Sequence, residues 1–308
     1  MKVNHRDNDE FLELLRTNQV PIGKGIGVEL DEYLRFKEAS FNIILGHANV
    51  GKTYWVLWYF LVLSAKHDLK HLIYSSENTV VGIKRNLFEL YLGKKITTFT
   101  PDEMAKAKEF VESHFDFIDT TKAQTLEEFM QGVQKMGKYD TLMIDPHNGF
   151  TRPRGTNAHD YDYEMATRLR LFAKQTRTSI YLCIHAATEA LRKTHKDGDY
   201  EGHPMPPNMS DAEGGGKWGN RADDFIVIHR YVADPHTWMF THVHVKKVKE
   251  TETGGKPTSL NSGVVFKYEY GTGFTCMGKN PLHDNKLPEH IQNYYKPLEA
   301  NDSFDLPF

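Results

Sequence analysis

The sequence is poor in cysteine and contains no long apolar run. Cys183 and Cys276 are its only cysteines, too few for a disulfide framework or a zinc cluster, so a reducing compartment is expected. The longest apolar stretch, residues 55–63, is far shorter than the roughly 20 residues that cross a membrane. The residues after Met1 lack the apolar core of a signal peptide. These absences predict a cytoplasmic protein without a membrane anchor.

The chain also lacks a strong excess of charge of either sign. Its net charge is −3, so any binding to nucleic acid has to come from local basic patches. The 16 histidines are scattered, without a metal-ligand spacing such as His-Glu-x-x-His. With 39% hydrophobic and 26% charged residues over 308 positions, the chain suits one large globular domain with small appendages.

One motif organises what is present: residues 46–53 read Gly-His-Ala-Asn-Val-Gly-Lys-Thr, which fits the phosphate-binding loop pattern. An apolar segment, residues 41–45, predicts a buried strand before it, and residues 54–66 predict a helix after it. In that setting backbone N–H groups and the helix N-terminus bind phosphate. We therefore expect ATP or another nucleoside triphosphate on Gly46, Asn49, Val50, Gly51, Lys52 and Thr53. Lys52 would reach the β- and γ-phosphates, and Thr53 would bind Mg²⁺.

Apolar segments alternate with helical patterns through most of the chain. Strands are predicted at residues 71–77, 115–119, 139–145 and 179–185, separated by helices, and this order predicts an α/β fold with a mostly parallel sheet flanked by helices. Strands at 224–230, 241–249 and 264–270 predict an antiparallel extension. We divide the chain into an N-terminal arm or linker helix (1–24), the ATPase core (25–281) and a loosely ordered tail (282–308). The arm helix packs either on its own domain or on a neighbouring subunit.

Three polar residues end predicted core strands, where parallel sheets bind ligands. Asp145 stands where a second carboxylate for the metal belongs, acting through water on Mg²⁺. Glu77 is the candidate base for the attacking water. His185 is a candidate γ-phosphate sensor, with a structural role as the alternative.

Basic residues follow two of these strands. Arg152 and Arg154 come after Asp145, whereas the loop after His185, residues 186–217, holds Arg192, Lys193, Lys196 and Lys217. Both loops should leave the nucleotide edge of the sheet and either contact a nucleic-acid backbone or remain solvated. Lys247 and Lys249 share one face of a late strand. They could reach the γ-phosphate of a neighbouring subunit, as an arginine finger does, or lie on a solvated edge.

Taken together these segments resemble ring-shaped replicative DNA helicases with a RecA-like core, and most of all the helicase half of Toprim primase-helicases of phages and mitochondria. The resemblance covers about residues 25–274. It is carried in order by the phosphate loop, Tyr-Ser-Ser-Glu-Asn (74–78), Ile-Asp-Pro-His-Asn (144–148), Ile-His (184–185), Gly-Lys-Trp-Gly-Asn-Arg-Ala-Asp (216–223), Val-Ile-His-Arg (227–230) and Val-Lys-Lys-Val-Lys (245–249).

The resemblance implies a RecA-like P-loop NTPase that hydrolyses ATP between the subunits of a ring, typically a hexamer, and moves along single-stranded DNA. By position Glu77 is then the base, Asp145 the metal carboxylate and His185 the sensor. Lys247 and Lys249 match the trans-acting lysine and arginine. Lys249 departs from the family because it stands where arginine is usual, and lysine cannot form the forked contact of a guanidinium. Arg230 is a nearby alternative.

Two further expectations follow. No primase segment precedes the core, so we expect priming to be left to another protein or to be absent, in a phage or mobile-element replisome. The tail Asp302–Phe308 is acidic and ends in phenylalanine, and it either recruits a replisome partner or has no role.

The function predicted from the sequence is therefore an ATP-dependent replicative DNA helicase. The alternatives are a RecA-like strand-exchange ATPase, which would form an open filament, and an ATP-gated loading protein with little turnover.

Overall fold

A nine-stranded sheet covered by helices on both faces forms the core of the protein. The computed structural model describes residues 12–17, 19, 22–260 and 262–283. Along the sheet the strand order is β3-β2-β4-β5-β1-β6-β7-β8-β9. The strands are β1 (Phe41–Gly46), β2 (His71–Ser75), β3 (Phe115–Phe117), β4 (Thr141–Asp145), β5 (Ser179–His185), β6 (Asp224–His229), β7 (Phe240–Val248), β8 (Val264–Tyr268) and β9 (Phe274–Cys276).

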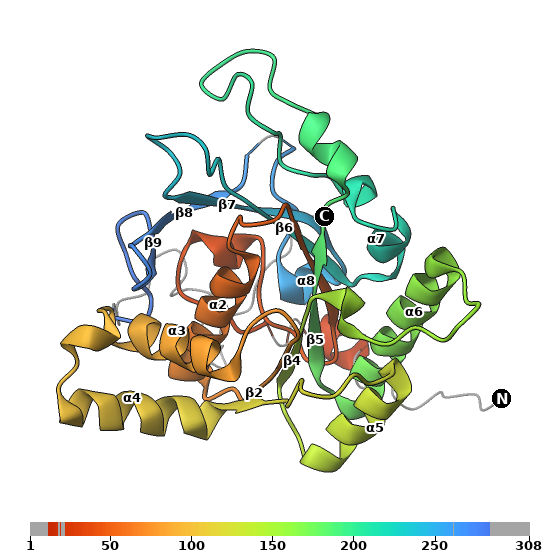
Figure 1. Cartoon of the computed structure of the whole chain (residues 1–308), viewed down its shortest axis with the longest axis horizontal. Helices are drawn as coiled ribbons and strands as arrows, with labels where there is room; N and C mark the ends of the chain where they lie inside the picture. The colour runs from red at the N-terminus through yellow and green to blue at the C-terminus, as the bar shows by residue number, and fades with distance from the viewer. Residues whose placement is uncertain (1–11, 18, 20–21, 261, 284–308) are drawn as a thin grey trace.

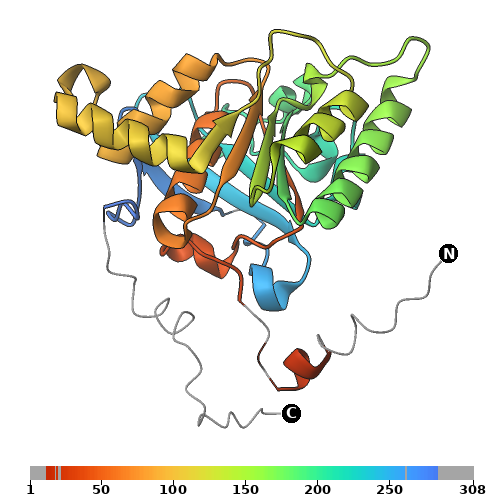
Figure 2. The ribbon, with the colours of Figure 1, turned by 90° about the horizontal axis from the view of Figure 1, so that it is seen from below.

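The helices lie in two layers, one on each face of the parallel strands (Figures 1 and 2). The helices of the first layer are α2 (Lys52–His67), α3 (Val80–Leu92) and α4 (Pro101–His114), and those of the second are α5 (Leu126–Met136), α6 (Ala158–Thr176) and the short α7 (Lys217–Arg221). A one-turn helix, α8 (Thr251–Gly254), follows β7. Alternate residues of β1 divide between the two cores: Ile44 packs with the α2 layer, whereas Ile43 and Leu45 pack with the α6 layer. Burial on both faces explains why the parallel strands read as continuous apolar runs.

Local sequence signals set the helix starts. Thr100 accepts a hydrogen bond from the backbone N–H of Glu103, whose side chain accepts from the backbone of Thr100, and this capping box begins α4. Thr125 and Glu128 repeat the arrangement at α5. The helix predicted at residues 54–66 begins two residues earlier, at Lys52, and ends one residue later, at His67.

The direction of the strands decides where polar residues meet. The six strands from β3 to β6 run parallel, and Gly46 pairs with His185 while Ser75 pairs with Asp145. Their carboxyl ends therefore share one edge of the sheet. β7 runs antiparallel to β6, so Val248 pairs with Asp224. The end of β7 accordingly reaches the opposite edge.

The structure confirms the mostly parallel sheet and its antiparallel extension, and adds the strand β9, which the sequence analysis did not predict. The loop of residues 186–217 is less irregular than expected, because 3₁₀ turns at Thr188–Arg192 and Met209–Asp211 and three β-bridges order it. Residues 12–16 are helical, and Leu12 and Leu15 stay exposed, so this helix does not bury its apolar side on its own domain.

Two further expectations concern the C-terminal tail and the membrane. The tail segment Asp302–Phe308 lies outside the described residues. Among the residues that the structure does describe, no helix is long and apolar enough to span a bilayer.

A candidate nucleotide site at the carboxyl edge of the sheet

The phosphate loop turns from β1 into α2 in the conformation that its glycines allow. Gly51 has a φ of 87° and Asn49 a φ of 62°, both in the left-handed region, which glycine and asparagine tolerate best. A Cβ on Gly46 would lie 2.5 Å from the carbonyl oxygen of Ile228, so no larger residue fits there without moving β6. The loop is thus shaped by close backbone packing, and its N–H groups lead into the N-terminus of the 16-residue helix α2.

Lys52 is buried at the base of this loop. Its ammonium donates hydrogen bonds to the carbonyl oxygens of Gly46 at 3.0 Å and His47 at 2.9 Å. Burial lowers the pKa of Lys52. The predicted contact with a triphosphate requires Lys52 to exchange these carbonyl partners for phosphate oxygens, which are stronger acceptors for an ammonium.

Thr53 and Asp145 form the predicted metal pair. The hydroxyl of Thr53 donates to Oδ2 of Asp145 at 2.6 Å, which joins the start of α2 to the end of β4. Burial raises the pKa of Asp145, while the Thr53 hydroxyl partly opposes that rise. Two hard oxygen ligands beside the phosphate loop fit Mg²⁺, which takes its other ligands from phosphates and water. Among the described residues, no group of three or more His, Cys, Asp or Glu could hold a metal ion.

Glu77 and His185 meet on the other side of Lys52. Oε1 of Glu77 lies 3.5 Å from Nε2 of His185, and Nδ1 of the same ring lies 3.3 Å from the ammonium of Lys52. The Glu77 side chain is 53% exposed, so water reaches it. A half-exposed carboxylate at the edge of the phosphate cradle can take a proton from water, and the imidazole between it and Lys52 can sense what Lys52 binds.

Arg230 also borders the phosphate loop, although the sequence analysis proposed it only as a substitute finger. Its guanidinium donates to the carbonyl oxygen of Trp238 at 3.0 and 2.7 Å and lies 4.9 Å from the ring centre of Tyr268. A Cβ built on Gly51 would be 3.4 Å from it. The guanidinium of Arg230 therefore lies beside the phosphate loop of its own chain. The position of Arg230 directly after strand β6, which neighbours β1, was the available signal.

The basic loops differ in how freely their charges face water. Arg152, Arg154, Arg192 and Lys196 are all exposed, as expected for residues of loops that leave the carboxyl edge. Lys193 is exposed too, but forms an ion pair with Asp211. The prediction for Lys217 as part of an exposed basic loop is wrong, because it is buried, 3.0 Å from Oδ2 of Asp162, and it begins α7.

Lys247 and Lys249 lie at the opposite edge of the sheet from the phosphate loop. The ammonium of Lys247 donates to the carbonyl oxygens of Gly219 at 2.8 Å and Ala222 at 2.7 Å. Lys249 lies 3.6 Å from a carboxylate oxygen of Asp223. Neither joins the site of its own chain, so any role in hydrolysis depends on a second protomer.

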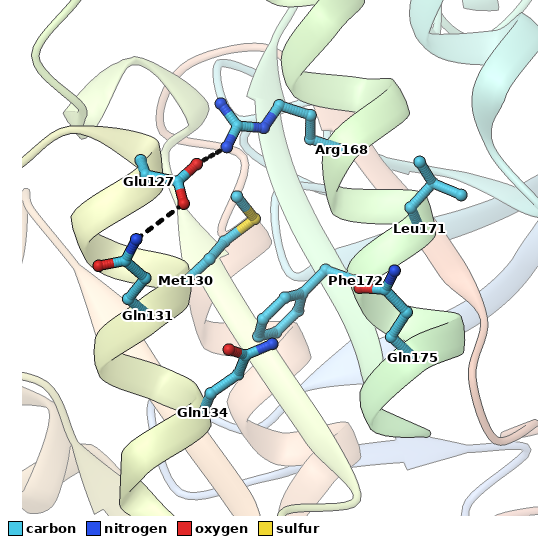
Figure 3. Close-up of a pocket in the computed structure, with 8 residues that line it drawn as sticks. All are labelled: Glu127, Met130, Gln131, Gln134, Arg168, Leu171, Phe172 and Gln175. Carbon is cyan, nitrogen blue, oxygen red and sulfur yellow. Dashed lines mark hydrogen bonds and ion pairs between the residues drawn. The ribbon is translucent and has the colours of Figure 1, made fainter.

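A groove between α5 and α6 lies apart from this constellation. It has a volume of about 250 Å³, and Figure 3 shows Met130 and Phe172 at its floor, glutamines at its rim, and Arg168 directed toward Glu127. Arg168 forms ion pairs with Glu127 and Glu164. No residue predicted to act in catalysis lines the groove.

Comparisons with known proteins agree with this architecture. No model of a protein family matches the chain. A Twinkle homologue of Arabidopsis thaliana, described as chloroplastic/mitochondrial, is 21% identical over 226 residues, which are 65% of this chain. The chain spans only 29% of that relative's length.

Solved structures resemble the chain in shape. A DnaB-like replicative helicase matches with a TM-score of 0.68 and 15% identity, over 89% of this chain and 67% of the other. A separately solved ATPase domain also matches with a TM-score of 0.68 and 15% identity, over 90% of this chain and all of that domain. A KaiC-like protein of Pyrococcus horikoshii matches with a TM-score of 0.54 and 14% identity, over 83% of this chain and 99% of the other. The strand order, the phosphate loop between β1 and α2, and these likenesses together establish that the chain has the RecA-like ATPase fold found in DnaB-like replicative helicases.

Proposed function

We propose that this protein is an ATP-hydrolysing DNA helicase that works as a ring, most simply a hexamer, on single-stranded DNA. One observation carries the proposal. Lys52, Thr53, Asp145, Glu77 and His185 come from four separate strand ends and converge around one phosphate loop. Phosphoryl transfer from ATP needs a phosphate cradle, a metal ligand and a group that positions water, and this arrangement holds a candidate for each.

Each residue has a stated task in this proposal. The loop from Gly46 to Thr53 binds the phosphates, and Lys52 binds the β- and γ-phosphates once it leaves the loop carbonyls. Thr53 and Asp145 hold Mg²⁺, which when bound supplies positive charge to the phosphate oxygens. Glu77 orients a water and accepts its proton. His185 lies between Glu77 and Lys52, so it is placed to respond to the γ-phosphate.

Arg230 and its aromatic neighbours are the candidate contact for the nucleotide beyond the phosphates. The guanidinium stands between the phosphate loop and the rings of Trp238 and Tyr268, 5.8 and 4.9 Å from their centres. Planar cations and aromatic rings stack on nucleobases. This position supports ATP, or another nucleoside triphosphate, as the ligand.

The DNA contact is proposed for the loops that follow β4 and β5. Arg152, Arg154, Arg192 and Lys196 stand at the same edge as the nucleotide and reach the surface, and cations on loops bind a phosphate backbone without reading its sequence. Lys193 is available only when it leaves Asp211, and Lys217 holds its loop in place rather than contacting DNA. His185 contacts Lys52 and directly precedes the second loop, so it connects the nucleotide site to that loop along the chain.

A ring is proposed because the chemistry of one protomer is incomplete. Lys247 and Lys249, the candidates for transition-state charge, lie across the sheet from their own phosphate loop. A neighbouring protomer in a closed ring would present them to it. The tail Asp302–Phe308 stays a candidate contact for a replisome partner.

The test is ATPase activity with and without single-stranded oligo-dT, together with particle symmetry by electron microscopy in a non-hydrolysable ATP analogue. The proposal expects closed rings and turnover stimulated by DNA. A helical filament would point to strand exchange instead. ATP binding with negligible turnover in the presence of DNA would point to a loading protein.

A further inference from the structure

Three cations gather around one carboxylate at the edge of the sheet opposite the phosphate loop. Nη2 of Arg170, on α6, lies 2.7 Å from Oδ1 of Asp223. The ammonium of Lys249 lies 3.6 Å from the same oxygen. Lys247 stands beside them, and burial lowers its pKa while Asp223 opposes that fall. Arg170 of α6 and Lys249, the residue after β7, thus contact the same carboxylate oxygen, while the ammonium of Lys247 donates to the nearby carbonyl oxygens of Gly219 and Ala222.

The cluster carries more positive than negative charge. Oδ1 of Asp223 contacts Arg170 and Lys249, and its other oxygen, Oδ2, accepts a hydrogen bond from the backbone N–H of Phe41 at 3.1 Å. The next carboxylate along the chain, Asp224, is buried and already paired with Lys37 at 2.8 Å. Asp223 therefore holds Arg170 and Lys249 through a single oxygen, although Glu38 and Glu250 line the same recess as Asp223 and Lys249.

Within the cluster, Arg170 is the residue with the chemistry that γ-phosphate recognition favours. A guanidinium offers a planar fork of donors to a phosphate, whereas an ammonium offers a point charge. The described residues place Arg230, the other candidate, beside its own phosphate loop. Position 249 itself is lysine, so the guanidinium at this edge comes from α6 and not from β7.

We propose that Arg170 acts as the arginine finger of this protein and that, with Lys249, it binds the γ-phosphate held by the neighbouring protomer. The inference rests on the proposed function, because it requires a nucleotide at a contact between protomers. In the isolated protomer Asp223 holds both cations through one oxygen. Arrival of a triphosphate offers a more highly charged partner, so both side chains leave Asp223 and take up phosphate contacts.

The side-chain environments agree with such an exchange. Arg170 is 23% exposed and Lys249 is 46% exposed, so both reach the surface. The Nε atom of Arg170 is buried and has no hydrogen-bond partner, so the ion pair with Asp223 leaves donor capacity of the guanidinium unused. An ion pair that served only to hold α6 would be expected to use the fork fully.

The first experiment compares Arg170→Ala with Arg168→Ala, a control on the same helix that also removes an ion-paired arginine, the one directed toward Glu127 in Figure 3. DNA-stimulated turnover of Arg170→Ala should fall by about 10³-fold, the usual effect of losing an arginine finger, while Arg168→Ala stays near wild type. The double variant Arg170→Ala with Lys249→Arg should recover at least about tenfold of that loss, because the fork is restored at the neighbouring position. Equal turnover in the two single variants, or no recovery in the double variant, overturns the proposal.

The second experiment mixes two inactive variants, Arg170→Ala and Glu77→Gln. In a ring, the intact phosphate site of the first then meets the intact Arg170 of the second at roughly a quarter of the interfaces of an equal mixture. Turnover should reappear on mixing. If rings are present by electron microscopy and turnover does not reappear, a trans role for Arg170 is overturned. If the alanine variant does not fold, Arg170→Lys, which keeps the ion pair with Asp223, replaces it in both experiments. Absence of DNA-stimulated turnover in the wild type, by contrast, overturns the proposed function itself.

Discussion

The roles of Glu77 and Lys52 are separable, because one side chain is half-exposed and the other is buried within the phosphate loop. The substitution Glu77→Gln keeps the size of the side chain and removes only the charge and the basic oxygen. Glu77 is 53% exposed and contacts His185 at 3.5 Å. Lys52→Met, by contrast, removes the ammonium that donates to the carbonyl oxygens of Gly46 and His47.

The expected sizes follow from these positions. A general base contributes about 10²–10⁴ in rate, so Glu77→Gln should lose turnover by that factor. As a surface substitution it should change the free energy of unfolding by less than about 0.5 kcal/mol. Nucleotide at a hundred times its Kd stabilises the folded state by about 2.7 kcal/mol. For a chain of 308 residues, that raises Tm by about 4 °C.

Thermal unfolding with and without Mg²⁺ and a non-hydrolysable ATP analogue measures binding, and phosphate release with oligo-dT measures turnover. Glu77→Gln should keep the rise in Tm and lose the release of phosphate, whereas Lys52→Met should lose both. Turnover within about tenfold of wild type in Glu77→Gln would reject Glu77 as the base. Loss of the Tm rise in Glu77→Gln would show instead that Glu77 is needed to bind nucleotide.

Three further predictions concern Thr53, Lys217 and His229. Thr53→Val removes the hydroxyl that contacts Asp145 at 2.6 Å, so half-maximal turnover should need about tenfold or more Mg²⁺, while Thr53→Ser should titrate like wild type. Lys217→Met leaves the partly buried carboxylate of Asp162 without its ion pair and should lower the free energy of unfolding in urea by about 3 kcal/mol; an unchanged value would contradict the structural role. Burial lowers the pKa of His229 to about 2, so only the unfolded chain takes up its proton as pH falls below about 6.5. As pH falls from about 7.5 to about 5.5, the free energy of unfolding measured in urea should therefore decrease by about 1.4 kcal/mol because of this residue. The variant His229→Leu should show a smaller decrease over the same pH range.

The sequence predicts well where one physical rule determines the outcome. The phosphate-loop motif requires a strand before it and a helix after it, and the structure has both. Strand β5 spans residues 179–185, as its apolar run predicts. Asp145 and His185 end strands that must be parallel, so their convergence follows from topology without any knowledge of side-chain contacts. Glu77 also lies beside His185, although the predicted strand 71–77 ends at Ser75, two residues before it.

Where tertiary contacts decide, the sequence misleads. Lys217 reads as one more cation in a glycine-rich loop, yet it is buried because Asp162 of α6 lies 3.0 Å away, and no local pattern encodes that partner. Arg170 reads as an ordinary polar position of an amphipathic helix. Only the folded chain brings it to Asp223, 53 residues later in the sequence.

The topology is the reason why the proposed mechanism needs two protomers for hydrolysis. The parallel strands carry the phosphate loop, Asp145 and His185 to one edge of the sheet, and the antiparallel turn into β7 carries Lys249 to the other. The strand between them, β6, has six residues, so the two edges stand roughly 20 Å apart at about 3.3 Å per residue. No side chain spans that distance. In the proposed function, a protomer would bind nucleotide at one edge and present Lys249 and Arg170 at the other, and a head-to-tail contact between protomers would join the two edges. Rapid hydrolysis by a monomer at high dilution would refute this division, because every group it used would then have to come from a single edge.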